Sequence, residues 1–364
     1  VNDKLTNQQL FNQKAFSIMS PAMYLVMNSL TMVIYFIGAY LIDAALMADK
    51  LQVFSDMVIF SSYAMQVIMS FLMLAMIFMI LPRASVSANR INEVLETSIT
   101  VPDGTIDKDI TSEVGTIEFK NVSFKYPDAE EYLLKDISFK VTAGETIAFI
   151  GSTGSGKSTL INLIPRFYDA TDGEVLIDGI NVKEYKQSYL FNKLGYVPQK
   201  AVIFSGTVKD NVAYGESKKP KTDDIIKKSI EVAQAKEFVE KMDKGYKTNL
   251  AQRGTNISGG QKQRLAIARA IARDPEIYIF DDSFSALDYK TDATLRKELK
   301  KHTKNATCVI VAQRIGTIMH ADKIMVLDNG KCVGYGTHEE LLKKCSVYKQ
   351  IALSQLSKEE LENA

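Results

Sequence analysis

The sequence predicts α-helical transmembrane segments followed by a larger α/β domain. Two long runs near the start, residues 22–42 and 57–81, contain no charged side chain. After residue 112, short strand-like runs alternate with longer helical stretches, which is the pattern of an α/β fold. Of the 14 methionines, 11 come before Pro82, so the first part is apolar and the second has a water-soluble composition.

Each uncharged run is long enough to cross a bilayer, because about 20 residues at ~1.5 Å rise cover the ~30 Å hydrocarbon thickness. The connection between the runs carries three aspartates and one lysine. The flanks of the pair carry basic residues: Lys4, Lys14, Arg83 and Arg90. By the positive-inside rule, both outer ends face the cytoplasm. Two spans cannot enclose a translocation path, so we expect further helices from a region before Val1, from a partner chain, or from both.

The composition argues against several classes of protein. A net charge of +1 gives no basic surface of the kind that attracts nucleic acid. The three cysteines form no CxxC pair, and the three histidines form no zinc-like cluster with them. We therefore expect no nucleic-acid partner, no structural metal, and reduced thiols of the kind found in the cytosol.

The chain divides into four regions. Residues 1–95 are interpreted as the C-terminal part of a transmembrane domain, and residues 96–112 as a linker, because Pro102 and Gly104 there interrupt a mixed-charge stretch. The soluble domain is expected over residues 113–357 and a tail over residues 358–364. Strands are expected in six apolar runs: residues 116–124, 145–150, 174–178, 277–280, 307–312 and 323–328.

A glycine-rich loop, GSTGSGKST, lies between one of these strands and a helical stretch. It meets the pattern GxxxxGK[ST], in which backbone N–H groups and a helix N-terminus surround phosphates. Lys157 would reach the β- and γ-phosphates, and Ser158 would ligate Mg²⁺. The loop therefore predicts binding of ATP with Mg²⁺. Its residues are Gly151, Ser152, Thr153, Gly154, Ser155, Gly156, Lys157, Ser158 and Thr159.

The run IYIFDD predicts a buried strand that ends in a carboxylate. Asp281 at its tip would lie near Mg²⁺, as the Walker B aspartate does. An apolar strand followed by two acids is common, so this run supports a nucleoside triphosphatase only together with the glycine loop.

Just upstream, ISGGQKQRLAIARA, residues 257–270, resembles the signature sequence of the ATP-binding cassette (ABC) family. Ser258, Gly259, Gly260 and Gln261 begin a helix, where free N–H groups and the helix dipole suit an anion. If Ser258 is considered without its neighbours, the alternative is that it only caps the helix.

Other family landmarks follow in order. Tyr126 resembles the aromatic residue that stacks on adenine. The alternative is that Tyr126 only packs in the hydrophobic core. Gln199 resembles the Q-loop glutamine that contacts Mg²⁺, Asp288 closes a D-loop-like SALD, and Gln313 occupies the switch position. The resemblance implies an ABC exporter half-subunit: a P-loop nucleotide-binding domain with a helical subdomain, preceded here by what resembles the last two of six spans.

Two positions depart from the family pattern. Asp282 stands where a glutamate usually orients or deprotonates the attacking water, and Gln313 stands where a histidine usually contacts the γ-phosphate. A shorter carboxylate and an uncharged amide both weaken the same reaction centre. The pattern resembles the degenerate member of a heterodimeric exporter, in which Ser258–Gln261 and Asp288 would serve the partner's site. Neutral drift with activity retained is the alternative.

The resemblance implies ATP-driven export of small amphipathic or hydrophobic compounds by a multi-pass protein of the cell membrane, with the nucleotide-binding domain in the cytoplasm and a second half-transporter as partner. One alternative is a regulatory membrane subunit gated by nucleotide, without transport of its own. Another is a soluble ABC ATPase that acts on DNA or ribosomes, against which the two apolar runs argue.

Overall fold

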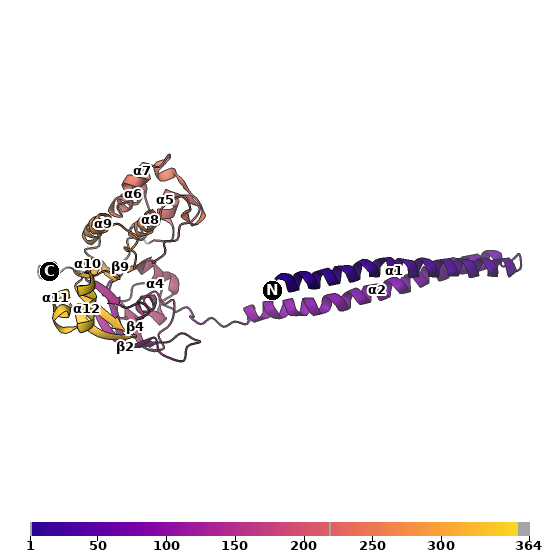
Figure 1. Ribbon diagram of the computed structural model, residues 1–364, viewed down its shortest axis with the longest axis horizontal. Coiled ribbons are helices and arrows are strands. Elements are labelled where there is room, and N and C mark those ends of the chain that lie inside the picture. Colours follow the sequence, from indigo (N-terminus) through magenta and orange to yellow (C-terminus); the bar gives the residue numbers. More distant parts are fainter. Residues whose placement is uncertain (1, 218–219, 356–364) are drawn as a thin grey trace. The chain divides into compact units, whose positions relative to one another are not determined.

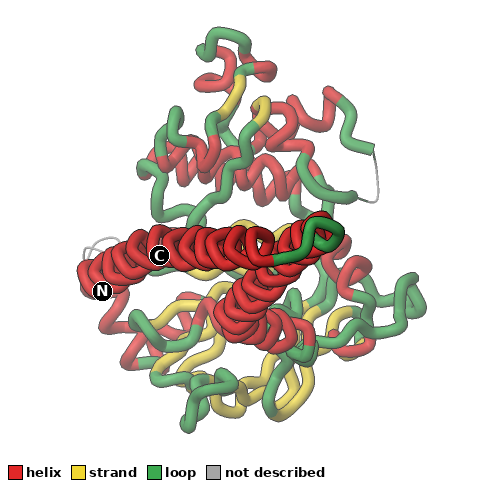
Figure 2. Tube along the Cα trace, turned by 90° about the vertical axis from the view of Figure 1, so that its right-hand side faces the viewer, coloured by secondary structure: helices red, strands yellow, loops and turns green. Residues whose placement is uncertain are grey.

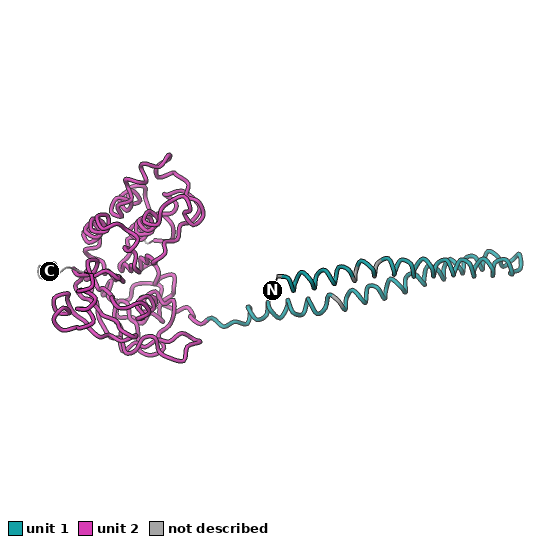
Figure 3. Tube along the Cα trace, viewed as in Figure 1, with its two compact units in different colours: residues 1–99 teal, residues 100–364 magenta. Residues whose placement is uncertain are grey.

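The computed structural model describes residues 2–217 and 220–355. The chain forms two compact units, residues 1–99 and residues 100–364, which are coloured separately in Figure 3. Val1, Lys218, Lys219 and residues 356–364, and with them the expected tail, lie outside the described residues.

The first unit is a pair of long helices, α1 (Asn2–Ala44) and α2 (Lys50–Leu95), joined by a short turn (Figure 1). Both expected spans lie within these helices, and both helices are long and apolar enough to cross a membrane. Pro82 ends the uncharged run but does not end α2, and Pro21 likewise lies inside α1. Each proline removes one backbone N–H from its helix.

The two helices contact each other through small side chains. Gly38 of α1 leaves no space for a larger residue, because a Cβ atom there would lie 2.1 Å from the Met57 sulfur of α2. The Thr31 hydroxyl donates to the Met27 carbonyl at 3.0 Å and lies 3.8 Å from the Met65 sulfur. Most other apolar side chains of this pair are exposed within the unit, as expected for surfaces that face lipid or further helices.

The second unit contains a six-stranded sheet with the order β12-β11-β3-β10-β9-β6. All neighbouring strands in it are parallel except β11 and β12. The strands are β3 (Thr146–Gly151), β6 (Leu194–Val197), β9 (Ile277–Asp281), β10 (Thr307–Val311), β11 (Lys323–Asp328) and β12 (Lys331–Gly336).

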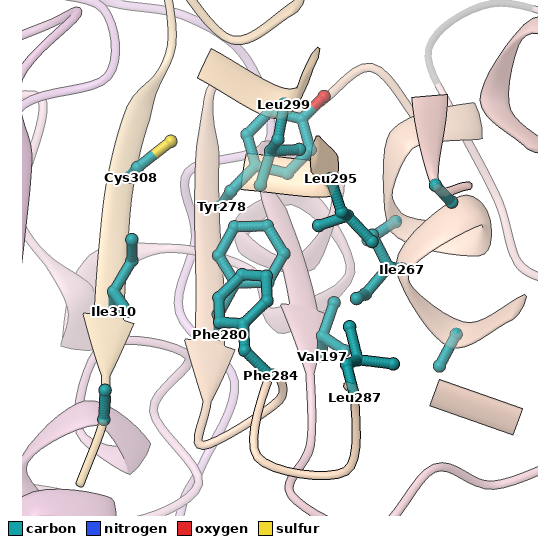
Figure 4. Packing of buried hydrophobic residues seen from close by; sticks show 14 of the residues in the cluster. Val197, Ile267, Tyr278, Phe280, Phe284, Leu287, Leu295, Leu299, Cys308 and Ile310 are labelled. Carbon is teal, nitrogen blue, oxygen red and sulfur yellow. The ribbon is translucent and has the colours of Figure 1, made fainter. Parts of the chain in front are cut away.

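The central strands are buried on both faces, which explains why they are continuous apolar runs rather than alternating ones. Tyr278 and Phe280 of β9 pack on the helical side of the sheet, as Figure 4 shows. Ile277 and Ile279 of the same strand pack in a second cluster on the opposite face. Adjacent residues therefore serve two cores, one on each side of the sheet.

A second, antiparallel sheet covers the other core. It has the order β2-β1-β4-β5, formed by β1 (Ile117–Phe124), β2 (Leu134–Val141), β4 (Asp172–Ile177) and β5 (Ile180–Asn181). A short pair, β7 (Gly206–Thr207) and β8 (Asn249–Leu250), lies elsewhere in the unit. All six expected strands are present, and the additional strands among the described residues are β2, β5, β6, β7, β8 and β12.

A helical subdomain is inserted between β6 and β9, as the fold class requires. It contains α5 (Val208–Ala213), α6 (Asp223–Val232), α7 (Lys236–Glu240) and α8 (Gly259–Ala272). In Figure 2 these helices gather in the upper part of the unit, and the large sheets lie below. The remaining helices are α3 (Lys157–Asn162), α4 (Gln187–Lys193), α9 (Tyr289–His302), α10 (Ile315–Ile318), α11 (His338–Lys344) and α12 (Ser346–Gln355).

Most of the expected linker belongs to the second unit, and an ion-pair cluster anchors it there. The Lys193 ammonium, whose side chain is 2 % exposed, contacts Asp109 at 2.7 Å, Asp178 at 2.8 Å and Glu276 at 2.9 Å. Burial alone would lower the pKa of Lys193, but these three carboxylates raise it above its ordinary value. Asp109 of the linker is thereby tied to residues that flank β4 and β9.

Candidate functional site

The glycine loop connects the carboxyl end of β3 to the N-terminus of α3. Gly154 and Gly156 have φ angles of 83° and 97°, a backbone conformation that residues with a side chain rarely adopt. A Cβ atom on Gly156 would lie 2.7 Å from the Leu134 side chain, whereas one on Gly154 would meet nothing within 4 Å. The backbone is thus free to approach a ligand at Gly154, and the loop has the strand and helix context expected for a phosphate-binding loop.

Lys157, the first residue of α3, folds back over the loop. Its ammonium donates to the carbonyl of Gly151 at 2.9 Å and to that of Ser152 at 2.7 Å. Burial lowers the pKa of Lys157, and the negative charges of Asp282 and Asp281 oppose that effect. A half-buried cation held by loop carbonyls is suited to bind the phosphate oxygens of a nucleotide.

Ser158 and Asp281 meet beside this loop. The Ser158 hydroxyl donates to Oδ1 of Asp281 at 3.0 Å, although the two residues are 123 positions apart. Asp281 ends β9, two strands from β3, and the carboxyl ends of parallel strands meet at one edge of the sheet. A hydroxyl and a carboxylate are hard oxygen donors of the kind that Mg²⁺ prefers, so these two residues fit the expected metal. When bound there, Mg²⁺ would offset phosphate charge.

Asp282 lies at the centre of a small amide cluster. Its Oδ2 accepts a hydrogen bond from Nε2 of Gln199 at 3.1 Å and another from Nε2 of Gln313 at 2.9 Å. The φ angle of Asp282 is 45°, a left-handed conformation that aspartate tolerates better than most residues. The amides of two separate loops therefore converge on one carboxylate oxygen of a third, and all three residues were identified from the sequence.

The surroundings of the two aspartates influence their protonation. Burial raises the pKa of Asp281, and the hydrogen bond from Ser158 opposes this. Burial also raises the pKa of Asp282, and the hydrogen bond from Gln199 opposes it there. Asp282 is therefore no weaker as a base than an ordinary aspartate.

Tyr126 follows β1 and lies beside the phosphate loop. Its hydroxyl is 3.0 Å from the Thr159 hydroxyl, and its ring packs edge-on against Phe124 and Tyr168. The ring is partly buried against the core, which is one of the two roles considered for Tyr126, and stacking on adenine stays a prediction.

The signature residues lie at the start of α8. The Ser258 hydroxyl accepts from the Gln261 backbone N–H at 3.3 Å, and Oε1 of Gln261 accepts from the Ser258 N–H at 2.9 Å. This is a capping box, so Ser258 is a helix cap whatever else it binds. Ser258 and Gly259 are exposed, and no atom would obstruct a Cβ on Gly259 within 4 Å. Asp288 caps α9 with its side chain, which accepts from the Thr291 N–H.

Two residues that the sequence did not single out support this site. The Tyr196 hydroxyl contacts Oδ1 of Asn162 at 3.1 Å and Oδ2 of Asp281 at 3.5 Å. The buried amide of Gln263 donates to the Pro198 carbonyl at 3.1 Å, which ties α8 to the segment that carries Gln199. Tyr196 could have been identified because it lies three residues before Gln199. For Gln263, the sole sequence signal is its place within the signature helix.

Fold and site together define a P-loop nucleotide-binding domain with an inserted helical subdomain. Residues 134–285 match the family described as ABC transporter. The chain is 44 % identical over 356 residues to an uncharacterized ABC transporter ATP-binding protein of Mycobacterium bovis, covering 97 % of this chain and 60 % of that protein. It is 42 % identical over 259 residues to a Staphylococcus aureus protein whose name provisionally assigns it to multidrug export as an ATP-binding/permease protein, covering 71 % and 44 %.

The chain is also similar to the solved structure of a bacterial Atm1-family ABC exporter with ATP bound. The TM-score is 0.74 at 32 % identity, over 85 % of this chain and 54 % of that one. The chain is therefore similar to ABC transporter ATP-binding/permease proteins, and its second unit is an ABC nucleotide-binding domain. It spans between 44 % and 60 % of the length of these curated relatives.

Proposed function

We propose that this chain is part of one half-subunit of a heterodimeric ABC exporter, and that its own ATP site binds nucleotide tightly but hydrolyses it slowly. The observation that carries the proposal is the state of Asp282: its Oδ2 is occupied by the amides of Gln199 and Gln313. A second half-subunit would then supply the site that hydrolyses ATP quickly.

Asp282 is proposed to be a weak general base because its short side chain does not reach the attacking water. Burial raises its pKa, so proton affinity is not lacking. Its side chain is one methylene shorter than the glutamate usual in the family, and two amide donors hold one of its oxygens in place. A general base must come within hydrogen-bond distance of the water that it activates, and a displacement of about 1 Å can reduce the rate ~100-fold.

Gln313 is proposed to weaken hydrolysis for a second reason. Its amide donates to Asp282 at 2.9 Å, and glutamine cannot carry the positive charge available to a histidine. The binding apparatus is unaffected by these changes, because the glycine loop, Lys157, Ser158 and Asp281 are arranged to hold a triphosphate with Mg²⁺. Binding and hydrolysis are therefore separated in this site.

The signature end of the domain keeps the family pattern. Ser258 and Gly259 present an exposed helix N-terminus, where unpaired backbone N–H groups favour an anion. We propose that Ser258, Gly259, Gly260, Gln261 and Asp288 face the nucleotide bound by the partner. The chain would then assist the partner's fast site.

The proposed cargo consists of small amphipathic or hydrophobic compounds, exported across the cell membrane with the ATPase domain in the cytoplasm. The support comes from the two apolar helices and from the ABC exporter that this chain resembles. Two helices do not make a translocation path, so the remaining helices would come from the rest of the half-subunit and from its partner.

Co-purification and vesicle transport test this function. The full-length protein is expressed with the half-transporter encoded next to it, and ATP-driven uptake of a hydrophobic dye into inverted vesicles is measured. We expect a stable heterodimer and uptake that requires both chains. A homodimer with full activity would contradict the proposal. Gating of a neighbouring membrane protein by ATP, with no uptake alongside any partner, would instead support a regulatory subunit.

A further inference from the structure

The last described residue of α12, Gln355, is bound to the loop that carries Gln313. Its Nε2 donates to the Gln313 carbonyl at 2.8 Å, and its Oε1 accepts from the Ile315 backbone N–H at 2.8 Å. The amide of Gln355 thus binds two backbone groups of this loop, the Gln313 carbonyl and the Ile315 N–H. Because an amide rotated by 180° would oppose donor to donor and acceptor to acceptor, these two partners fix its orientation.

The Ile315 N–H is the first of α10 and needs an acceptor. Helices leave their first N–H groups unpaired, and a side chain at the N-cap usually satisfies one of them. The N-cap of α10 is Arg314, which makes no such bond and has no acceptor oxygen to offer. Gln355 therefore supplies, from 40 residues further along the chain, an acceptor that the local sequence lacks.

The helix that carries Gln355 is held firmly. Tyr348 and Ala352 of α12 are both 0 % exposed, and the Tyr348 hydroxyl lies 2.6 Å from Nδ1 of the buried His338. The amide of Gln355 is consequently attached to a packed helix rather than to a free end. On its other side, the loop places the Gln313 side chain on Asp282 at 2.9 Å.

We propose that Gln355 is a positioning residue of the ATP site. It fixes the backbone of residues 313–315, and through that backbone it holds the Gln313 amide on Asp282. The structural contact stands by itself, whereas its effect on hydrolysis rests on the proposed function of Asp282 and Gln313. Gln355 contacts neither the glycine loop nor Ser158 in residues 2–217 and 220–355, so it should leave ATP binding unchanged.

Hydrogen exchange of the nucleotide-free full chain in nanodiscs tests the contact. Gln355→Leu removes both bonds, and exchange of one amide in the peptide that covers Ile315 should become about 10-fold faster. Gln355→Glu keeps an acceptor for Ile315 but cannot donate to Gln313, so protection of Ile315 should remain. Gln350→Leu changes an exposed glutamine of the same helix and serves as the matched control. Unchanged exchange in Gln355→Leu would overturn the proposal.

Single-site turnover tests the consequence. In Gln355→Leu, kcat at this chain's site should rise about 3- to 10-fold with an unchanged ATP dissociation constant, since the Gln313 amide would no longer be held on Oδ2 of Asp282. A purely structural residue would instead weaken binding and stability together. Faster exchange at Ile315 with an unchanged kcat would overturn the positioning role. Fast ATP turnover in the unmodified chain would contradict the proposed slow hydrolysis at this site. It would not affect the hydrogen-exchange evidence for the contact of Gln355 with the loop.

Discussion

The carboxylate of Asp282 and the hydroxyl of Ser158 have different partners in the site. Ser158 donates to Asp281, the acid that ends β9, whereas Asp282 turns to the amides of Gln199 and Gln313. In the proposed function, the Ser158 hydroxyl belongs to the metal-binding corner and the Asp282 carboxylate occupies the place of the catalytic base. Substitutions at the two positions should separate nucleotide binding from nucleotide hydrolysis.

Ser158→Ala should weaken ATP binding only when Mg²⁺ is present. The hydroxyl is one of two oxygen donors proposed for the metal, and loss of a hydrogen-bonding partner of a charged group corresponds to roughly a 10-fold loss of affinity. ATP affinity is measured by fluorescence of a labelled nucleotide in Mg²⁺ and in EDTA. The EDTA value should not change. An equal loss in both buffers would show that Ser158 contacts the phosphates rather than the metal.

The residue types at this site were predictable from the sequence, but their mutual contacts were not. The glycine loop and the acid pair have local patterns tied to strand ends, so Lys157, Ser158 and Asp281 could be identified one by one. Gln199 lies 83 residues from Asp282, and only the folded sheet brings them together. Gln355 has no local pattern at all, because its partners are backbone groups and any sequence offers those.

At the scale of secondary-structure elements, the buried ammonium of Lys193 ties α4 to the linker and to the ends of two strands. Its contacts with Asp178 and Glu276 are mostly shielded from water, whereas Asp109 is 56 % exposed. A buried ion pair contributes little compared with an apolar replacement of both partners. Removal of one partner, however, leaves an uncompensated charge.

Lys193→Met should destabilise the second unit by about 3–5 kcal/mol, because Asp178 would be left buried without its cation. Thermal and urea unfolding of the full chain in nanodiscs, followed through the ATPase domain, measures the effect. Lys186→Met is the matched control, since Lys186 pairs with Asp107 on the surface. The control should unfold like the unmodified chain. Equal loss in both variants would contradict a special role for Lys193.

Strands with continuous apolar runs were the easiest to predict, and several strands with other patterns were missed. The six expected strands include β3, β9, β10 and β11, whose side chains fill cores on both faces. By contrast, β2 alternates buried and exposed positions around irregular pairing with β1, and β12 is largely exposed and contains two glycines. Such strands gain their stability from pairing with a neighbour, which a single run of sequence does not reveal.

At the scale of the whole molecule, the first unit exposes apolar helices and the second presents a signature surface. Both features are understood best in an assembly, the first in a membrane with further helices and the second against another nucleotide-binding domain. The proposed assembly predicts that a change in this chain's signature alters hydrolysis in the partner.

Ser258→Asp should reduce hydrolysis by the partner while leaving ATP binding by this chain unchanged. Aspartate caps helices as well as serine does, so α8 is retained, but its charge would repel a triphosphate. ATPase activity of the co-purified pair should fall at least ~10-fold, since like charges in contact cost several kcal/mol. Thr222→Asp makes the same change at the cap of α6 and is the control. Full activity in Ser258→Asp would contradict the shared site.

The most direct test of the slow ATP site is the identity of the nucleotide held by this chain. The co-purified pair is loaded with photoreactive ATP labelled on its α-phosphate, crosslinked after increasing delays, and the nucleotide on this chain is identified as ATP or ADP. The unmodified chain should retain ATP, and the double variant Asp282→Glu with Gln313→His should convert it at least ~10-fold faster, as a competent base requires. Conversion at the same rate in both proteins would contradict the account.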